Sequence, residues 1–165
     1  MFVYPPVGFH FSVAFELTPQ TPADFRFQEV GGLEMTMEME SVKEGGQNRF
    51  TWELPVRTTY ADLELKRGMF VGSGILTWCK NALENFVFDP VNVIVMLLNA
   101  RHEPIQAWYV VNAIPKKWSL SSFNAEQSAV VVESITLSYQ YFNIISVDSA
   151  FSMAGNAGGS VSVSI

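Results

Sequence analysis

One change in the spacing of apolar residues sets the fold class of this chain. In 60–66, apolar and polar residues alternate, which is the pattern of a strand with one buried face. After Gly72-Ser73-Gly74 the period becomes helical, and the apolar stripe consists of Ile75, Leu76, Trp78, Cys79, Ala82 and Leu83. No other stretch has a convincing helical period. We therefore predict a mainly β protein, an antiparallel sandwich or barrel, with one α-helix at about 73–85.

Alternating or continuous apolar runs predict the strands. They cover 7–17, 25–30, 33–42, 57–66, 91–98, 105–114 and 129–142. The run at 91–98, VNVIVMLL, is almost entirely apolar, as expected of a strand that is covered on both faces. Lys66-Arg67-Gly68 and Pro115-Lys116-Lys117 are each expected to end a strand, and the prolines within 18–23 predict a turn.

The stretch 33–42, LEMTMEMESV, has the cleanest alternation in the sequence. One face carries Met35, Met37 and Met39, and the other carries Glu34, Thr36, Glu38 and Glu40. We expect the second face to be wet and acidic, while the methionines pack inward. The connection that follows, 43–55, bends at Gly45-Gly46 and carries two large aromatic residues, Phe50 and Trp52. Such a loop is expected either to fold back on its own core or to dock on a partner.

The balance of charges limits the function classes. Charged residues make up only 16% of the chain and apolar residues 48%, which suggests that other subunits cover part of the surface. The net charge of −6 argues against nucleic-acid binding, because such proteins normally carry a basic face. No basic-then-apolar leader opens the sequence and no apolar run reaches transmembrane length, so we expect folding in the cytoplasm without direct membrane insertion.

The sequence contains no convincing catalytic or metal-binding motif, and no cofactor is expected. His10 and His102 lie in unrelated segments, and the spacings HExxH and paired CxxC do not occur. Gly72-Ser73-Gly74 lacks the flanking residues of a nucleophile elbow or a P-loop, which favours a hinge into the helix. The single cysteine, Cys79, lies on the apolar stripe and is expected to be a buried packing residue.

The chain is predicted to form one β domain over 1–147, followed by a flexible tail over 148–165. Its length of 165 residues suits a single domain with a sizeable core. From Asp148 the composition shifts to glycine, serine and alanine, which is typical of a flexible segment.

Four motifs occur in order along the chain. They are VGGLE at 30–34, LELKRG at 63–68, WYVVNAIP at 108–115 and ESITLSY at 133–139. In this order they resemble the inner tube protein of contractile phage tails and of the related extracellular contractile injection systems. The resemblance covers about 4–145, and the Gly- and Ser-rich tail departs from it.

The resemblance implies a structural protein and not an enzyme. Subunits of this family form homo-hexameric rings, in which neighbouring sheets join into one ring-shaped barrel, and the rings stack into a hollow tube. The implied partners are a sheath protein, baseplate and spike proteins, tube-terminating proteins and effector cargo in the lumen. Contraction of the sheath drives the tube through a target envelope. The subunit would assemble in the cytoplasm and become part of a phage-like or extracellular injection particle.

The resemblance also implies roles for three groups of residues. The lumen-lining group consists of Glu34, Thr36, Glu38, Glu40, Asp62 and Glu64. The loop that contacts the adjacent ring is represented by Gly45, Gly46, Asn48, Phe50 and Trp52. The outer face of the helix, turned toward a neighbour or the sheath, is represented by Lys80, Asn81 and Glu84. In the same helix, Trp78 and Leu83 are expected to be buried.

Two other function classes stay open at this point. One is a soluble β-sandwich or barrel with its aromatic residues around a ligand cavity. The other is an acidic glycoside hydrolase, although Glu34, Glu38 and Glu40 are spaced along a single strand without a second acidic cluster. Among tube proteins, a phage, an extracellular injector and a cell-anchored system are all compatible with the sequence.

Overall fold

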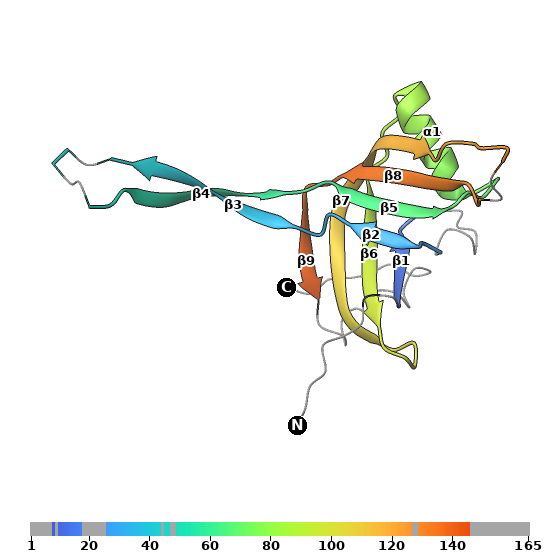
Figure 1. Ribbon diagram of the computed structural model, residues 1–165, viewed down its shortest axis with the longest axis horizontal. Coiled ribbons are helices and arrows are strands. Elements are labelled where there is room, and N and C mark those ends of the chain that lie inside the picture. Colours follow the sequence, from blue (N-terminus) through green and yellow to red (C-terminus); the bar gives the residue numbers. More distant parts are fainter. Residues whose placement is uncertain are drawn as a thin grey trace.

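The computed structural model describes residues 8, 10–17, 26–43, 45–46, 49–126 and 129–145. Over these residues the chain is mainly antiparallel β structure with one α-helix, as predicted (Figure 1). The elements follow one another as β1 (Phe11–Phe15), β2 (Glu29–Gly31), β3 (Met35–Val42), β4 (Trp52–Tyr60), β5 (Leu63–Gly68), α1 (Gly74–Asn85), β6 (Val91–Leu98), β7 (Pro104–Leu120), β8 (Val132–Ser138) and β9 (Tyr141–Ile145).

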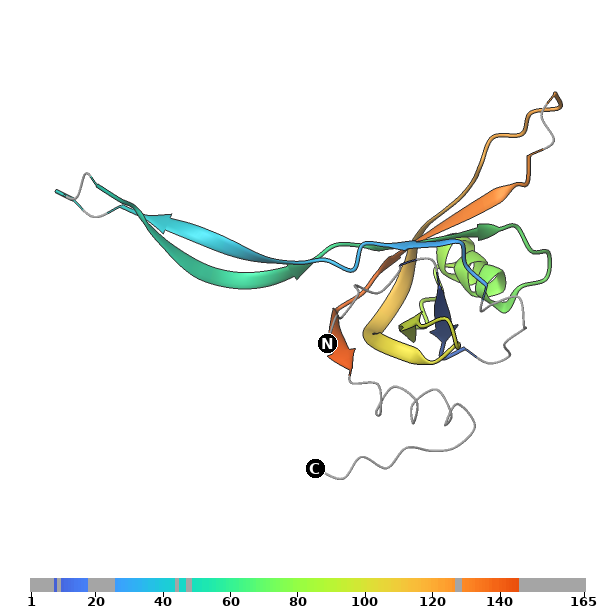
Figure 2. The ribbon, with the colours of Figure 1, turned by 60° about the horizontal axis from the view of Figure 1, so that its bottom comes forward.

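The long strand β7 belongs to two sheets. Its first half pairs with β6 and β9, and β6 pairs with β1; we call these strands sheet A. Its second half pairs with β8, followed by β5 and β2, and these strands form sheet B. Between the halves, Asn112 has a positive φ of 52° and the register shifts between Pro115 and Lys117. The strand therefore bends from one sheet into the other (Figure 2).

The core lies between the two sheets and the helix. The sheets contribute Val13, Phe15, Leu63, Leu65, Val93, Val110, Ile135 and Leu137, and the helix contributes Ile75, Trp78, Cys79 and Ala82. The ring of Trp78 meets that of Phe15 edge to face at a centroid distance of 6.0 Å. The helix begins where predicted, because the Ser73 hydroxyl caps it and accepts a hydrogen bond from the Leu76 N–H at 3.4 Å.

A third sheet, of two strands, projects from the body (Figures 1 and 2). It consists of β3 and β4, which continue β2 and β5 across short connections at 32–34 and 61–62. We call β3, β4 and the turn between them the arm. With eight residues in β3 and a rise of about 3.4 Å per residue, the arm extends roughly 27 Å from the edge of sheet B.

Several predicted boundaries hold and others are wrong. The strand at 91–98 is confirmed as β6, whereas 57–66 contains the end of β4 and the start of β5. Similarly, 129–142 divides into β8 and the beginning of β9. β7 continues through Pro115-Lys116-Lys117 instead of ending there. In its second half, β7 pairs with β8 on one side only, and the register shifts just after Pro115. A proline, which has no backbone N–H, is accommodated at such an edge position or bulge.

The body is an open sandwich in a single subunit. Within the described residues, sheets A and B each have free edges and do not close into a barrel. Leu83 was expected in the core but is 40% exposed, because it lies at the edge of the buried stripe of α1 and not at its centre. The predicted turn at 18–23 and the predicted tail at 148–165 lie outside the described residues.

Candidate functional site

The arm exposes apolar side chains on both faces. Met35, Met37 and Met39 are 49%, 51% and 49% exposed, so within one subunit they do not pack inward as expected. On the opposite face, Trp52 and Leu54 are exposed to the same degree. A two-stranded hairpin is at best marginally stable alone in water. Exposed apolar side chains on both of its faces therefore mark the arm as a contact surface.

The pairing of β3 with β4 defines how the two faces of the arm are oriented. Met35 lies opposite Tyr60, so these two side chains share a face. The ring of Tyr60 packs on those of Tyr139 and Phe142 in the body, at centroid distances of 6.0 and 5.4 Å. Where the arm leaves sheet B, its methionine face is therefore continuous with the side of the sheet that packs on the core. Its glutamate face is continuous with the other side of sheet B, on which Glu64 is exposed.

Gly32 forms the junction between the arm and the body. It has a positive φ of 87°, and a Cβ at this position would lie 1.9 Å from the carbonyl oxygen of Asp62. The Tyr139 hydroxyl donates a hydrogen bond to the Gly32 carbonyl at 3.3 Å. Burial, with smaller contributions from Tyr60 and Asp62, raises the pKa of Tyr139 to about 12, so this hydroxyl keeps its proton at pH 10, where an ordinary tyrosine is half ionised. Because the backbones of Gly32 and Asp62 lie so close together, a side chain does not fit at position 32.

The residues predicted to line a lumen are mostly exposed in the subunit. Glu34, Thr36, Glu40 and Glu64 are exposed. Glu38 is half-buried and accepts a hydrogen bond from Nε of Arg57 at 2.5 Å, while Asp62 accepts one from Nζ of Lys116 at 2.6 Å. These cross-strand partners did not follow from the sequence. In a continuous strand over 60–66, Tyr60 would share the polar face of Asp62 and Glu64, but it packs on the core side instead.

The predicted contact loop lies at the far end of the arm. Gly45 and Gly46 form its turn, and Asn48 lies outside the described residues. Phe50 and Trp52 are about half exposed, and their rings meet edge to face at a centroid distance of 5.2 Å. Because Trp52 is the first residue of β4, the loop is shorter than predicted.

The predicted outer residues of the helix are exposed on α1. They are Lys80, Asn81 and Glu84. Nζ of Lys80 lies 3.8 Å from the Glu84 carboxylate, and the Asn85 amide donates to the Asn81 side chain at 3.3 Å. Both contacts stay within the helix, so this face is accessible from outside the subunit.

A buried ion pair joins sheet B to the start of the helix, and sequence reasoning missed it. Arg67 on β5 lies opposite Glu133 on β8, and the two residues are 1% and 0% exposed. The guanidinium of Arg67 donates from Nε to Glu133 and from Nη2 to the Ser73 hydroxyl at 2.6 Å. Nε1 of Trp118 donates to the second carboxylate oxygen of Glu133 at 3.3 Å. Arg67 is in phase with the buried Leu65, and this alternation is the signal that could have revealed it.

The two histidines lie close together, which the sequence did not indicate. His10 and His102 were assigned to unrelated segments, but their rings meet edge to face at a centroid distance of 4.4 Å, because the Leu98 N–H donates to the His10 carbonyl beside the β6–β7 turn. Across the described ranges, no three side chains of histidine, cysteine, aspartate or glutamate gather to hold a metal ion. In the same part of the chain, no helix has the length and apolar character to cross a membrane.

Cys79 is buried, as predicted, and we expect its thiol to be unreactive in the folded subunit. Burial, reinforced by the charge of Glu133, raises the pKa of the thiol from 9.0 to about 12. The thiolate fraction at pH 8 should therefore be about a thousandfold lower than for an ordinary cysteine. Alkylation followed by mass spectrometry should label Cys79 only in denaturant, while a Phe123→Cys control reacts without it. Equal labelling rates for both thiols would contradict this assignment.

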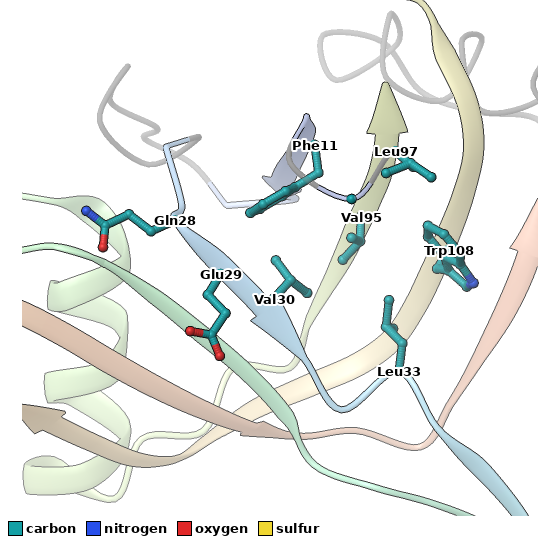
Figure 3. A pocket seen from close by; sticks show the side chains of 9 residues that line it. Phe11, Gln28, Glu29, Val30, Leu33, Val95, Leu97 and Trp108 are labelled. Carbon is teal, nitrogen blue, oxygen red and sulfur yellow. The ribbon is translucent and has the colours of Figure 1, made fainter. Parts of the chain in front are cut away.

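An apolar cavity of about 260 Å³ opens beside β2. The side chains of Phe11, Val95, Leu97 and Trp108 converge on it from sheet A, and Val30 and Leu33 from the opposite side (Figure 3). Gln28 and Glu29 lie at its rim and point away from it (Figure 3). The cavity lacks the convergent polar groups that orient a small ligand. It lies next to the base of the methionine face, beside an unpaired strand edge.

Comparisons with known proteins agree with this fold and its projecting arm. The family model of the T4-like virus tail tube protein gp19 matches residues 7–143. A chain in the cryo-EM structure of the anti-feeding prophage baseplate, 6-fold symmetrised, is 28% identical over 88% of this chain and 99% of that one, with a TM-score of 0.80. A chain of the sheath-tube complex of the extracellular contractile injection system PVC, in the extended state, is 23% identical over 87% and 93%, with a TM-score of 0.73. A crystal structure of an Hcp protein is 13% identical over 84% and 94%, with a TM-score of 0.57. No curated protein matches the sequence.

The two likenesses at 23% and 13% identity show a shared fold. The match to the family model goes further, because it runs from β1 into the first half of β9 and includes the arm. Nothing in these matches supports the ligand-binding alternative. With its projecting arm and open sheets, this chain belongs to the T4-like virus tail tube protein gp19 family and is a structural tube subunit.

Proposed function

We propose that this chain builds the rigid inner tube of a contractile injection apparatus, as homo-hexameric rings stacked around a hollow lumen. Its similarity to chains in a baseplate, a sheath-tube complex and a tube-terminating cap suggests a sheath protein, baseplate and spike proteins and a terminator as its partners. Assembly takes place in the cytoplasm, and contraction of the sheath drives the tube and its cargo through a target envelope. The role is structural and requires no catalytic group.

The arm is the observation that carries this proposal. Half-exposed methionines cover one of its faces, and the half-exposed Trp52 and Leu54 lie on the other face near the tip, which favours partners over the methionine face and at the tip. In the described residues, sheet B also has free edges at β2 and at the second half of β7. Joining such edges between copies would continue the sheet around a ring and remove the sites at which edge strands aggregate.

We assign the glutamate face of the arm and the exposed side of sheet B to the lumen wall. The wall residues are Glu34, Thr36, Glu38, Glu40, Asp62 and Glu64. A large barrel places one face of its sheet on water and the other on a packed layer, and α1 with sheet A supplies that layer here. Repeated around each ring, the carboxylates would repel anions and keep cargo from adhering. Lys80, Asn81 and Glu84 would then face a neighbour or the sheath.

The tip of the arm is proposed as the contact with the adjacent ring. Replacing Phe50 and Trp52 together by serine should leave a folded subunit, because both side chains are about half exposed. It should abolish long tubes, because the aromatic anchors are lost. Negative-stain microscopy and sedimentation measure tube length, and thermal unfolding measures stability.

Phe123→Ser is the matched control for this experiment. Phe123 is 74% exposed on the β7–β8 connection, far along the chain from the arm, so its loss should leave tube length unchanged. Tubes of normal length from the Phe50 and Trp52 double variant would refute the role of the arm tip.

A further inference from the structure

The methionine face of the arm places three oxidisable sulfur atoms on one exposed surface. Met35, Met37 and Met39 are three of the seven methionines in the chain, and they occupy alternate positions of β3. Their side chains are 49%, 51% and 49% exposed, whereas Met96 in β6 is partly buried. Because residues two apart in a strand lie on the same face about 7 Å apart, the three thioethers form one row.

Strand propensity does not explain these methionines, because β-branched and aromatic residues are the ones enriched in strands. A methionine side chain is flexible and polarizable, so a row of them adapts well to a partner surface. The same thioether is also reactive, since oxidation to the sulfoxide turns an apolar side chain into a polar one. A contact surface made of methionines is therefore sensitive to oxidants.

The oxidant in question is a peroxide, and the reaction needs no catalytic group of the protein. A lone pair of the sulfur attacks one oxygen of hydrogen peroxide, and the O–O bond breaks. The proton of the transferred oxygen passes to the departing hydroxide, which leaves as water. The sulfur loses two electrons, the peroxide gains them, and the product is methionine sulfoxide.

The residues across the arm treat the three positions differently. Thr58 lies opposite Met37, and its hydroxyl donates a weak hydrogen bond to the Met37 sulfur at 4.0 Å. A donor is therefore in place for an oxygen added to that sulfur. Met39 lies opposite Pro55, whose side chain has no donor. Under a covering apolar layer, a sulfoxide at Met39 would be buried without a hydrogen bond, which is unfavourable.

We propose that Met35, Met37 and Met39 form an oxidation site through which peroxides keep the subunit from joining a tube. The proposal rests on the proposed function, in which a partner covers the methionine face. The free subunit, with its sulfur atoms exposed, is the vulnerable form, and a finished tube protects them. Methionine sulfoxide reductases reverse the modification, so oxidation suspends assembly without destroying the subunit.

Treating the full-length subunit with hydrogen peroxide before assembly tests this site. Peptide mapping by mass spectrometry should find sulfoxide at Met35, Met37 and Met39. The tube yield should fall on the order of tenfold, because polar S–O groups must be buried. The midpoint of thermal unfolding should stay the same, since the three side chains lie outside the core. Reduction by methionine sulfoxide reductases should restore the yield.

The matched control replaces the three residues together, as Met35→Leu, Met37→Leu and Met39→Leu. This variant keeps Met69, which is 40% exposed between β5 and α1, and it should form tubes after the same treatment. Two further variants have leucine at two of the three positions and keep either Met37 or Met39. After oxidation, the variant that keeps Met39 should lose more tube yield. Equal losses would contradict the roles given to Thr58 and Pro55.

Tubes that form before the treatment provide a second measurement. Their three methionines should oxidise on the order of tenfold more slowly than in the free subunit, because the face is covered. Equal rates, or a normal tube yield from a wild type that is fully oxidised at these positions, would show that the inference is wrong and would leave the proposed function standing. A wild type that never assembles without peroxide would instead contradict the proposed function, and the inference with it.

Discussion

Replacing Gly32 by alanine is expected to destabilise the subunit by about 3 kcal/mol and to misplace the arm. The added Cβ would lie 1.9 Å from the carbonyl oxygen of Asp62, at a φ of 87° that an L side chain rarely adopts. The backbone must therefore shift where β2 passes into β3 and where β4 passes into β5. Urea unfolding measures the free energy, and microscopy measures the loss of rings and tubes.

Gly31→Ala is the matched control for this change. Gly31 is the adjacent residue, but a Cβ there meets nothing within 4 Å and its φ is not positive. Its substitution should change the free energy of unfolding by less than about 1 kcal/mol. Equal stability of the two alanine variants would show that the close approach at Gly32 does not determine the position of the arm.

Removing one member of the buried ion pair should have an effect at least as large. Glu133→Gln removes the buried carboxylate charge that pairs with Arg67, which is expected to cost about 3–5 kcal/mol. For a chain of this length the midpoint of thermal unfolding should fall by roughly 10 °C. Helix formation should suffer as well, because the same guanidinium bonds to the capping residue Ser73. Circular dichroism measures both effects.

The exposed pair on the arm is the matched control for the buried pair. Glu38→Gln removes the partner of Arg57, whose side chain is 71% exposed, so the loss should stay below about 1 kcal/mol. Replacing both buried partners, as Arg67→Met with Glu133→Leu, should recover part of the stability lost in Glu133→Gln, since both charges of the buried pair are then replaced by apolar side chains. A Glu133→Gln variant as stable as Glu38→Gln would contradict the structural role of the pair.

The sequence correctly predicted the helix and those strands whose form depends on neighbouring residues. The helical stripe around Trp78 and Cys79 and the apolar run at 91–98 were both found, because their periods are set by neighbouring residues. The alternation at 33–42 correctly separated the methionines from the glutamates. It did not predict that both faces would be exposed, because burial depends on which element lies across the strand. In a single subunit the described residues place no packed layer over Met37.

Contacts between residues that lie far apart in the sequence could not be predicted from local patterns. Arg67 and Glu133 are far apart in the chain and meet only because β5 pairs with β8 in a particular register. The same is true of the close approach between Gly32 and the Asp62 carbonyl, which depends on the pairing of β2 with β5. Assignments of the arm and helix surfaces to the lumen, the next ring or the sheath depend on other copies. They are therefore tested only in the assembly.

Cryo-electron microscopy of the assembled wild-type chain is the most direct test of the central claim. The expected result is a tube of stacked six-fold rings, with Glu34, Glu38, Glu40 and Glu64 facing a continuous channel. The arm of each copy should cross to a neighbour, with its methionine face covered. A protein that remains monomeric under all assembly conditions, or a tube with these carboxylates on its outer surface, would contradict the claim.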